Sequence, residues 1–404
     1  MYKKFYLNIF ILALISFVLI GSFNFIIDPY GLFRNFEKVG INQQKEGVRN
    51  KIRYVKSIQV LTQNPKTLII ASSRVHDGVN PESAMIPKTY KPVYNYGIPM
   101  IRIKEVKLFL LHALKSHNVK NVIIGLDFFM FNSKEKLNHE LDPKIFDNKF
   151  QMLNLYIKPL ISATALNDSI QTIKISHAYK DRKEFFANGY RPGSQVNFGL
   201  KNYEKLHNYM NWTFLSSRQT ETLYYENYGL DEEVFSDFKE VIAICKKNHI
   251  NLILYISPAH ANLDGEGIVV SKNFALFEEW KRKITKISDD MKIPLWDFSG
   301  YNSITTEAVK TPMKNYWDSS HFTEKIGDLI LAKILNNKDY ISTVPISFGV
   351  KLTPETIESH LHQIKLDRQL YLKSNFHEIN DLHSMYIKAL NGAKQDPKEI
   401  EGMF

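Results

Sequence analysis

Short apolar segments alternate with longer amphipathic segments over most of this chain, and that alternation limits the folds available to it. The apolar segments have the length of buried strands, and the amphipathic ones repeat apolar residues at helical spacing. Strands that alternate with helices favour an α/β protein with a doubly wound parallel sheet. The predicted strands are 68–71, 93–96, 121–126, 251–256 and 294–298, and the predicted helices are 45–62, 101–116, 231–248, 272–288 and 323–335.

The N-terminal run adds a second constraint. No charged side chain occurs from Phe5 to Ile27, and about 23 helical residues cross a hydrocarbon core of roughly 30 Å. Lys3 and Lys4 precede the run while Asp28 follows it, so the N-terminus is expected in the cytoplasm and the main domain outside. A cleaved signal peptide is the alternative. The run is longer than a usual signal core and lacks a small-x-small cleavage pattern, which favours an uncleaved single-pass anchor.

A polar tip follows the first predicted strand. Residues 68–71 lead into Ser72-Ser73-Arg74, and the Asp77-Gly78 pair indicates a turn. In open parallel sheets, ligands bind in the crevice at the carboxyl ends of the strands. A hydroxyl in this position is therefore well placed for chemistry, although a serine there needs a base.

Asp318 and His321 supply the other groups that such a serine needs. They lie three residues apart in YWDSSHF, immediately before the helical pattern 323–335. This spacing lets one carboxylate orient one imidazole within a single loop. The chain order, with Ser73 first and the Asp and His together near the end, differs from that of nucleophile-elbow hydrolases and the main serine protease families.

These segments resemble the SGNH (GDSL-type) hydrolase superfamily. Residues 71–73 match its Gly-Asp-Ser block loosely, and residues 318–321 match its Asp-x-x-His block closely. The chain is more similar still to bacterial membrane-anchored SGNH-like proteins, through Asp-Pro-Tyr-Gly at 28–31, Gly-x-Asp-Phe at 125–128 and Ser-Pro-x-His at 257–260. The resemblance extends from Asn24 to about Leu335 and implies an SGNH, flavodoxin-like fold.

The resemblance also implies roles for particular residues. The nucleophile takes the third position of the first block, which selects Ser73 over its rival Ser72, while His321 would take the proton and Asp318 would hold His321. Oxyanion donors come from the nucleophile N–H, a glycine N–H and an asparagine side chain, for which Gly97 and Asn95 are the candidates here.

The third block of the family departs from its usual form. Asp127 stands where the family has asparagine, and an ionised carboxylate cannot donate to an oxyanion. Asp127 is expected to bind Arg74, to bind a substrate hydroxyl, or to satisfy backbone donors at the strand end. Arg74 suits carboxylate or phosphate recognition, and His260 follows a strand end that faces the same crevice. Both are substrate-binding candidates, and an incidental loop histidine is the alternative for His260.

The chain divides into three predicted parts. Residues 1–30 form a cytoplasmic stub and anchor, 31–340 form the α/β domain, and 341–404 form a helical extension of unassigned role. Residues 132–229, rich in Asn, Lys, Tyr and Phe, are expected to be a mostly helical insertion over the sheet. That insertion holds either sugars or a partner protein, or else is a small satellite core.

Composition restricts the partners. The net charge of +10 suits an acidic surface, but the lysines are dispersed and no dense basic run indicates a nucleic-acid site. The single cysteine, Cys245, lies in an amphipathic stretch and cannot form an intrachain disulfide. No Cys/His metal spacing occurs, and a Ser-His-Asp triad needs no cofactor.

Together with the Ser73, His321 and Asp318 pattern, the resemblance implies a serine-dependent O-acyltransferase or carbohydrate esterase, tethered to a bacterial inner membrane with its domain in the periplasm or outside the cell. The related anchored proteins function in alginate acetylation and teichoic-acid D-alanylation. The resemblance implies a cell-envelope polysaccharide or glycolipid acceptor and a multispanning membrane acyltransferase partner. The alternative is a non-catalytic envelope protein that binds a glycan or scaffolds that partner.

Overall fold

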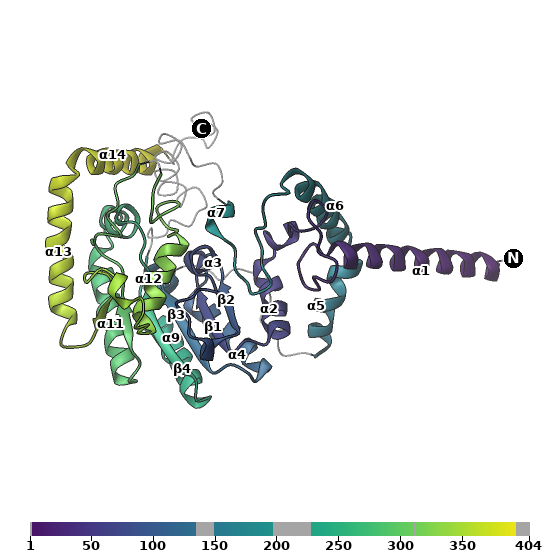
Figure 1. Cartoon of the computed structure of the whole chain (residues 1–404), viewed down its shortest axis with the longest axis horizontal. Helices are drawn as coiled ribbons and strands as arrows, with labels where there is room; N and C mark the ends of the chain where they lie inside the picture. Colours follow the sequence, from purple (N-terminus) through teal and green to yellow (C-terminus); the bar gives the residue numbers. More distant parts are fainter. Residues whose placement is uncertain (1, 135–148, 197–227, 311, 393–404) are drawn as a thin grey trace.

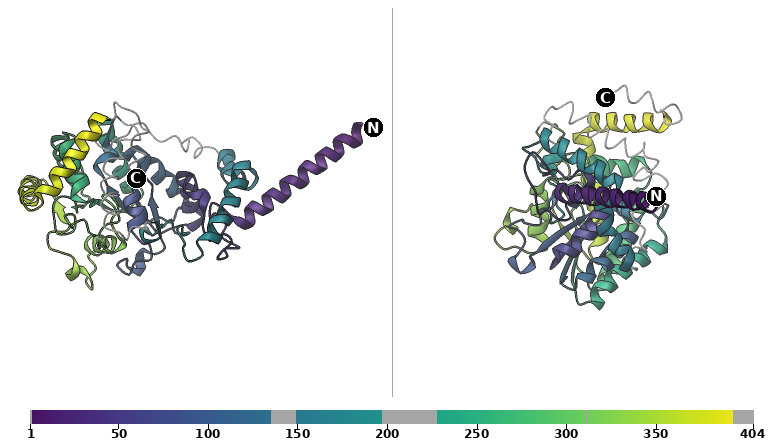
Figure 2. Two further views of the ribbon diagram at one scale, coloured as in Figure 1. Left: turned by 90° about the horizontal axis from the view of Figure 1, so that it is seen from above. Right: turned by 90° about the vertical axis from the view of Figure 1, so that its right-hand side faces the viewer.

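A computed structural model describes residues 2–134, 149–196, 228–310 and 312–392. It is a mixed α/β structure with one six-stranded sheet. Helix α1 (Tyr2–Ile27) extends from the body as a separate rod (Figures 1 and 2). Its length and hydropathy would allow it to cross a membrane.

The strands lie in the order β2-β1-β3-β4-β5-β6, and every neighbouring pair is parallel except β5 and β6. The parallel sheet predicted from the alternation is therefore confirmed for β1 to β5, while the antiparallel pairing of β6 was not predicted. In-register pairing places the carboxyl ends of β1 to β4 along one edge of the sheet. The strands are β1 (Thr67–Ala71), β2 (Val93–Gly97), β3 (Asn121–Leu126), β4 (Asn251–Ile256), β5 (Leu295–Asp297) and β6 (Val350–Leu352).

Both faces of the sheet are covered because its strands are apolar on both sides. Leu68 and Ile70 of β1 belong to one buried cluster and Ile69 and Ala71 to another. The first cluster includes side chains of α4 (Ile103–Ala113), α9 (Glu232–Lys247) and α11 (Phe274–Asp290), and the second includes side chains of α3 (Ser73–Gly78) and α12 (Glu324–Ile334). Access to the sheet is consequently confined to its ends.

Two local predictions are wrong. The Asp77-Gly78 pair lies inside α3 rather than in a turn, because Ser72 caps this helix and its Oγ accepts the Arg74 N–H at 3.3 Å. The helix predicted for 45–62 is divided into a 3₁₀ turn, η1 (Glu46–Val48), and α2 (Ile52–Gln63).

The insertion was predicted to lie over the sheet, but its described helices lie elsewhere. Its helices α5 (Lys149–Ile161) and α6 (Ala163–Ala178) pack against the end of α1 (Figure 2). The Asn24 amide donates to the Leu160 carbonyl at 2.7 Å, and Ser169 Oγ donates to Asn24 Oδ1 at 2.8 Å. This part of the insertion packs with η1 and α2 in a small satellite core, which is one of the alternatives predicted for the insertion. The members of this core are Tyr30, Val48, Ile52, Val55, Ala165 and Phe185. Residues 135–148 and 197–227 of the insertion lie outside the described residues.

The C-terminal extension is helical as predicted, with α13 (Ile357–Ser374) and α14 (Phe376–Gly392) close to the helical patterns at 354–372 and 375–390 of the sequence. It also contributes β6, which was not predicted, as an antiparallel edge strand on β5. Arg368 of α13 and His383 of α14 both bind Glu266, in the π-helical turn η6 (Ala261–Gly267). The extension is therefore part of the body rather than an appendage.

Candidate functional site

Ser73 is the first residue of α3, which follows β1 at the edge of the sheet where the parallel strands end. Its Oγ is 2.8 Å from His321 Nε2, although the two residues are 248 positions apart. Both residues are only partly buried, while Ser72 beside them is fully buried. The predicted meeting of the hydroxyl and the imidazole is confirmed, and the hydroxyl that meets the ring belongs to Ser73 rather than to Ser72.

Asp318 holds the other side of the imidazole. Its Oδ2 is 2.7 Å from His321 Nδ1, and its Oδ1 accepts the backbone N–H groups of Ser320 and His321, both at 2.7 Å. Burial raises the pKa of Asp318, but His321 and these two N–H groups outweigh burial and hold it below its ordinary value. Asp318 therefore remains ionised and fixes the ring with Nε2 toward Ser73.

The pKa of His321 shifts in the opposite direction from that of Asp318. Burial lowers the pKa of the imidazole, but the Asp318 carboxylate, with a smaller contribution from Asp77, raises it above 6.5. A more basic imidazole accepts a proton more readily. The arrangement can therefore remove the proton from the Ser73 hydroxyl and stabilise the imidazolium that results.

Arg74 forms a buried ion cluster behind the serine. Its Nη1 is 2.7 Å from Asp127 Oδ1 and 2.8 Å from Asp264 Oδ2, and its Nη2 is 3.0 Å from Asp264 Oδ1. Its Nε also donates to Ser320 Oγ at 3.2 Å. The side chain is 1% exposed, so Arg74 does not offer its guanidinium to a substrate. The predicted pairing of Asp127 with Arg74 is confirmed. Together, the contacts of Arg74 with Asp127, Asp264 and Ser320 join α3 to the end of β3, to η6 and to the loop that carries His321.

The two predicted oxyanion donors serve the scaffold instead. Asn95 Nδ2 donates to the carbonyls of Val75 and Val79, both at 2.8 Å, and its Oδ1 accepts the Gly97 N–H at 2.9 Å. These bonds dock α3 on the end of β2. A side chain at Gly97 would collide with the backbone of His76, so the glycine is needed for close packing.

His260 is also placed differently from the prediction. It is fully buried, its Nε2 is 2.7 Å from the Glu307 carbonyl, and its Nδ1 accepts the Asn262 N–H at 3.2 Å. Burial lowers the pKa of His260 to about 4. With both nitrogens occupied, this neutral ring organises the η6 loop and does not face the crevice as a substrate ligand.

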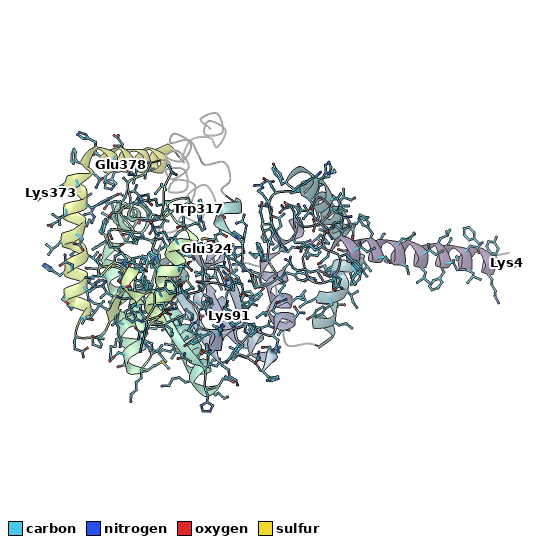
Figure 3. All side chains as sticks on the ribbon, viewed as in Figure 1. Lys4, Lys91, Trp317, Glu324, Lys373 and Glu378 are labelled. Carbon is cyan, nitrogen blue, oxygen red and sulfur yellow. The ribbon has the colours of Figure 1, made fainter. Side chains whose placement is uncertain are left out.

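A returning segment of the insertion, residues 185–193, crosses the site and is called the strap below. The Arg191 N–H donates to the His76 carbonyl at 3.2 Å, and its Nη1 is 3.5 Å from Asp77 Oδ2. Gly193, which starts α7 (Gly193–Val196), lies directly against the indole of Trp317, labelled in Figure 3. The strap therefore joins α3 to the loop that carries Asp318 and His321.

Sequence reasoning missed Asp264 and the strap. Asp264 pairs with Arg74 over 190 positions, and no local spacing signals such a contact. Within the described residues, no group of three or more His, Cys, Asp or Glu side chains could hold a metal ion. No protein-family model matches the chain, and no curated protein matches it either.

Proposed function

We propose that this chain is a membrane-tethered, SGNH-like serine acyltransferase or esterase that acts on O-acyl groups of a cell-envelope glycan. The observation that carries the proposal is the continuous relay from Ser73 Oγ through His321 to Asp318, with contacts of 2.8 Å and 2.7 Å. A covered, mostly parallel sheet whose strand ends support the relay is consistent with a doubly wound SGNH fold.

In this mechanism Ser73 Oγ attacks an acyl carbonyl as His321 Nε2 takes the hydroxyl proton. The acyl–oxygen bond of the donor breaks, and the leaving group receives that proton from the imidazolium. A sugar hydroxyl or water then attacks the acyl-serine, with His321 again accepting and returning a proton. The Ser73 N–H is in the first turn of α3, where backbone N–H groups have no intrahelical partner, and is available to the developing oxyanion.

The tether supports an envelope location. Asn24 and Ile27, at the end of α1, are 1% and 5% exposed, so cleavage near this point would remove part of the folded domain. We infer that α1 is retained as the anchor of a bacterial inner membrane protein with its domain periplasmic or extracellular. Tethering raises the effective concentration of surface-bound donors and acceptors, which favours transfer to a polysaccharide or glycolipid, with a multispanning acyltransferase as the proposed source of acyl groups.

A non-catalytic glycan-binding protein is the second candidate. The observation that favours it is the engagement of Asn95 and Gly97 by the scaffold, together with a carboxylate at position 127. These features remove two of the usual oxyanion donors. Loss of one such donor costs about 100-fold or more in rate, so an enzyme with this site would be slow. A slow enzyme and a glycan-binding protein are therefore distinguished chiefly by whether Ser73 is reactive.

Labelling with a fluorophosphonate separates these candidates. We expect the full chain in detergent to become covalently labelled, because the probe needs an activated serine but no acceptor. Ser73→Ala should abolish labelling, whereas Ser72→Ala should retain it, because Ser72 Oγ caps α3 and bonds Asp127 while the hydroxyl of Ser73 is left in place. Absence of labelling in the folded wild type, or equal labelling of wild type and Ser73→Ala, would reject the catalytic proposal.

The same reaction should depend on pH through His321. The imidazole must be neutral to accept the serine proton, and its raised pKa keeps it protonated to a higher pH than an ordinary histidine. Below that pKa the labelling rate should fall about tenfold per pH unit, and above it the rate should level off. Asp318→Asn should shift the pH range in which the labelling rate falls to lower pH, and it should also lower the constant rate reached at high pH. A flat profile between about pH 5 and pH 9 would contradict histidine control.

A further inference from the structure

The exposure of α1 falls toward its C-terminal end, although Ser22 and Ile26 stay exposed there. Side chains through Leu19 are exposed, whereas Asn24 and Ile27 are buried against the domain. From Phe5, the first residue after Lys3 and Lys4, to Leu19 the helix has 15 residues and a length of ~22 Å, so a hydrocarbon core of roughly 30 Å extends past Gly21 toward Asn24. If α1 spans a bilayer, the membrane surface therefore falls between Gly21 and Asn24, where the domain begins.

Six large apolar side chains are exposed around this level, on two segments that both contact α1. They are 39% to 67% exposed and are called the apolar collar: Phe36, Val39 and Ile41 from the loop after α1, and Leu153, Ile157 and Ile161 from α5. Single exposed apolar residues are ordinary in soluble proteins. A group of six at the base of one apolar helix indicates a surface that meets an apolar phase.

Two contacts fix the level of the collar along α1. Ile161 Cγ2 is 4.0 Å from the position of a Cβ at Gly21, and the ring centroid of Phe36 is 6.0 Å from that of Phe25. On α5 the three apolar residues recur every fourth position and so form one stripe along the helix. Both halves of the collar are thus continuous with the apolar surface of α1, whose far end carries Lys4 in Figure 3.

A positive charge accompanies this stripe. Lys158 is exposed on α5, and no ion pair of its side chain is found among the described residues. It borders a pocket of about 210 Å³ that is also lined by Lys51, Tyr30 and Tyr54. The Lys51 charge is balanced by Asp168 at 2.9 Å, so Lys158 provides the uncompensated charge at the mouth of this pocket.

We propose that the apolar collar lies in the membrane interface and that Lys158 binds the phosphate of an anionic phospholipid at this pocket. The inference rests on the proposed function only in requiring α1 as an anchor. A helix that lies in the interface with an apolar face inward and a cationic side chain at headgroup level follows the physics of interfacial helices. Attachment through α1 and the collar together fixes the orientation of the domain, which α1 alone would leave free.

Spin labels in the full chain, reconstituted in nanodiscs of phosphatidylcholine and phosphatidylglycerol, test the position of the collar. Cys245 is buried and leaves single introduced cysteines as the accessible thiols of the described part. The label at Ile157→Cys should collide with dissolved oxygen more than with a water-soluble nickel chelate. The matched control is Ile346→Cys, an isoleucine that is 97% exposed outside the collar, where the chelate should dominate.

A third label separates failure of the collar from failure of the anchor. Leu12→Cys should be buried in lipid if α1 spans the bilayer. If the Leu12 label is in lipid while the Ile157 label is as water-accessible as the Ile346 label, the collar proposal is wrong and the anchor stands. Protection of the Ile157 label from both reagents would reveal a protein partner or a second copy on the collar and would equally overturn the proposal.

The lipid site itself is tested by charge removal. Lys158→Gln should reduce the phosphatidylglycerol retained in native mass spectrometry by about fivefold, the contribution expected of one lysine at an anionic surface. Lys239→Gln, a change at an exposed lysine of α9, is the matched control and should retain the wild-type amount. Equal retention by the two variants, or displacement of the lipid by millimolar inorganic phosphate, would contradict a phospholipid site at Lys158.

Discussion

Ser73→Ala is expected to reduce acyl release from a chromogenic acetate ester by about 10³-fold or more, because loss of the nucleophile from such a triad removes the covalent route entirely. His321→Ala should have a comparable effect, and the double variant should be little worse than either, since the serine and its base function as one unit. Ser72→Ala provides the control: it removes the Ser72 Oγ cap on the Arg74 N–H but keeps the nucleophile and its base, so its effect on the rate should be far smaller than that of Ser73→Ala.

The same assay distinguishes transfer from hydrolysis. Wild-type hydrolysis of small esters should be slow and should accelerate when an envelope polysaccharide is present, because the acyl-serine then meets its acceptor. Fast hydrolysis that does not depend on the acceptor would favour an esterase. Equal rates for wild type and Ser73→Ala, with and without glycan, would leave the glycan-binding alternative as the better account.

Local signals explain why the central contacts of the site could be predicted. Asp318 and His321 belong to one loop, so the spacing alone brings carboxylate and imidazole together. Ser73 follows a five-residue buried strand, and parallel strands place their carboxyl ends at one edge. These parts depend on periodicity and short-range geometry, which a sequence displays directly.

The supporting contacts depended on packing and were not predictable in the same way. Asn95 and Gly97 lie at the expected strand end. That Asn95 binds the backbone of α3, and that Gly97 binds Asn95, becomes visible only once α3 is placed against β2. His260 follows a strand end and yet turns into the body. Strand β6 is only three residues long, too short for a recognisable alternation, and it pairs with β5 through a distant contact.

The insertion illustrates a further limit. Its aromatic composition fitted both a ligand-binding surface and a satellite core, and the described part contains the core around Tyr30 and Phe185. The position of α5 and α6 against α1 is stabilised by Asn24, a polar residue at the end of an apolar helix. Its amide bonds to residues of α5 and α6. A buried amide needs such partners, but its sequence position does not identify them.

Arg74→Met should cause the largest loss of stability. The arginine lies between Asp127 and Asp264, whose side chains are 0% and 11% exposed, and its removal leaves one fully buried and one partly buried carboxylate without their cation. Removing one partner of a buried ion pair costs about 3–5 kcal/mol in the free energy of unfolding. Because α3 begins at Ser73, the relay to His321 should loosen as well.

Arg282→Met is the matched control for this prediction. Arg282 binds Glu358 through two hydrogen bonds of 2.6 Å and 2.9 Å, but these side chains are 41% and 65% exposed, so the loss should be about 1 kcal/mol or less. Urea unfolding of the full chain in detergent measures both variants. Adding Asp127→Asn to Arg74→Met should restore part of the stability, because one buried charge is then neutralised. If Arg74→Met costs no more than Arg282→Met, the buried cluster is not what holds α3 in place, and the position of Ser73 must instead depend on the Asn95 contacts and the strap.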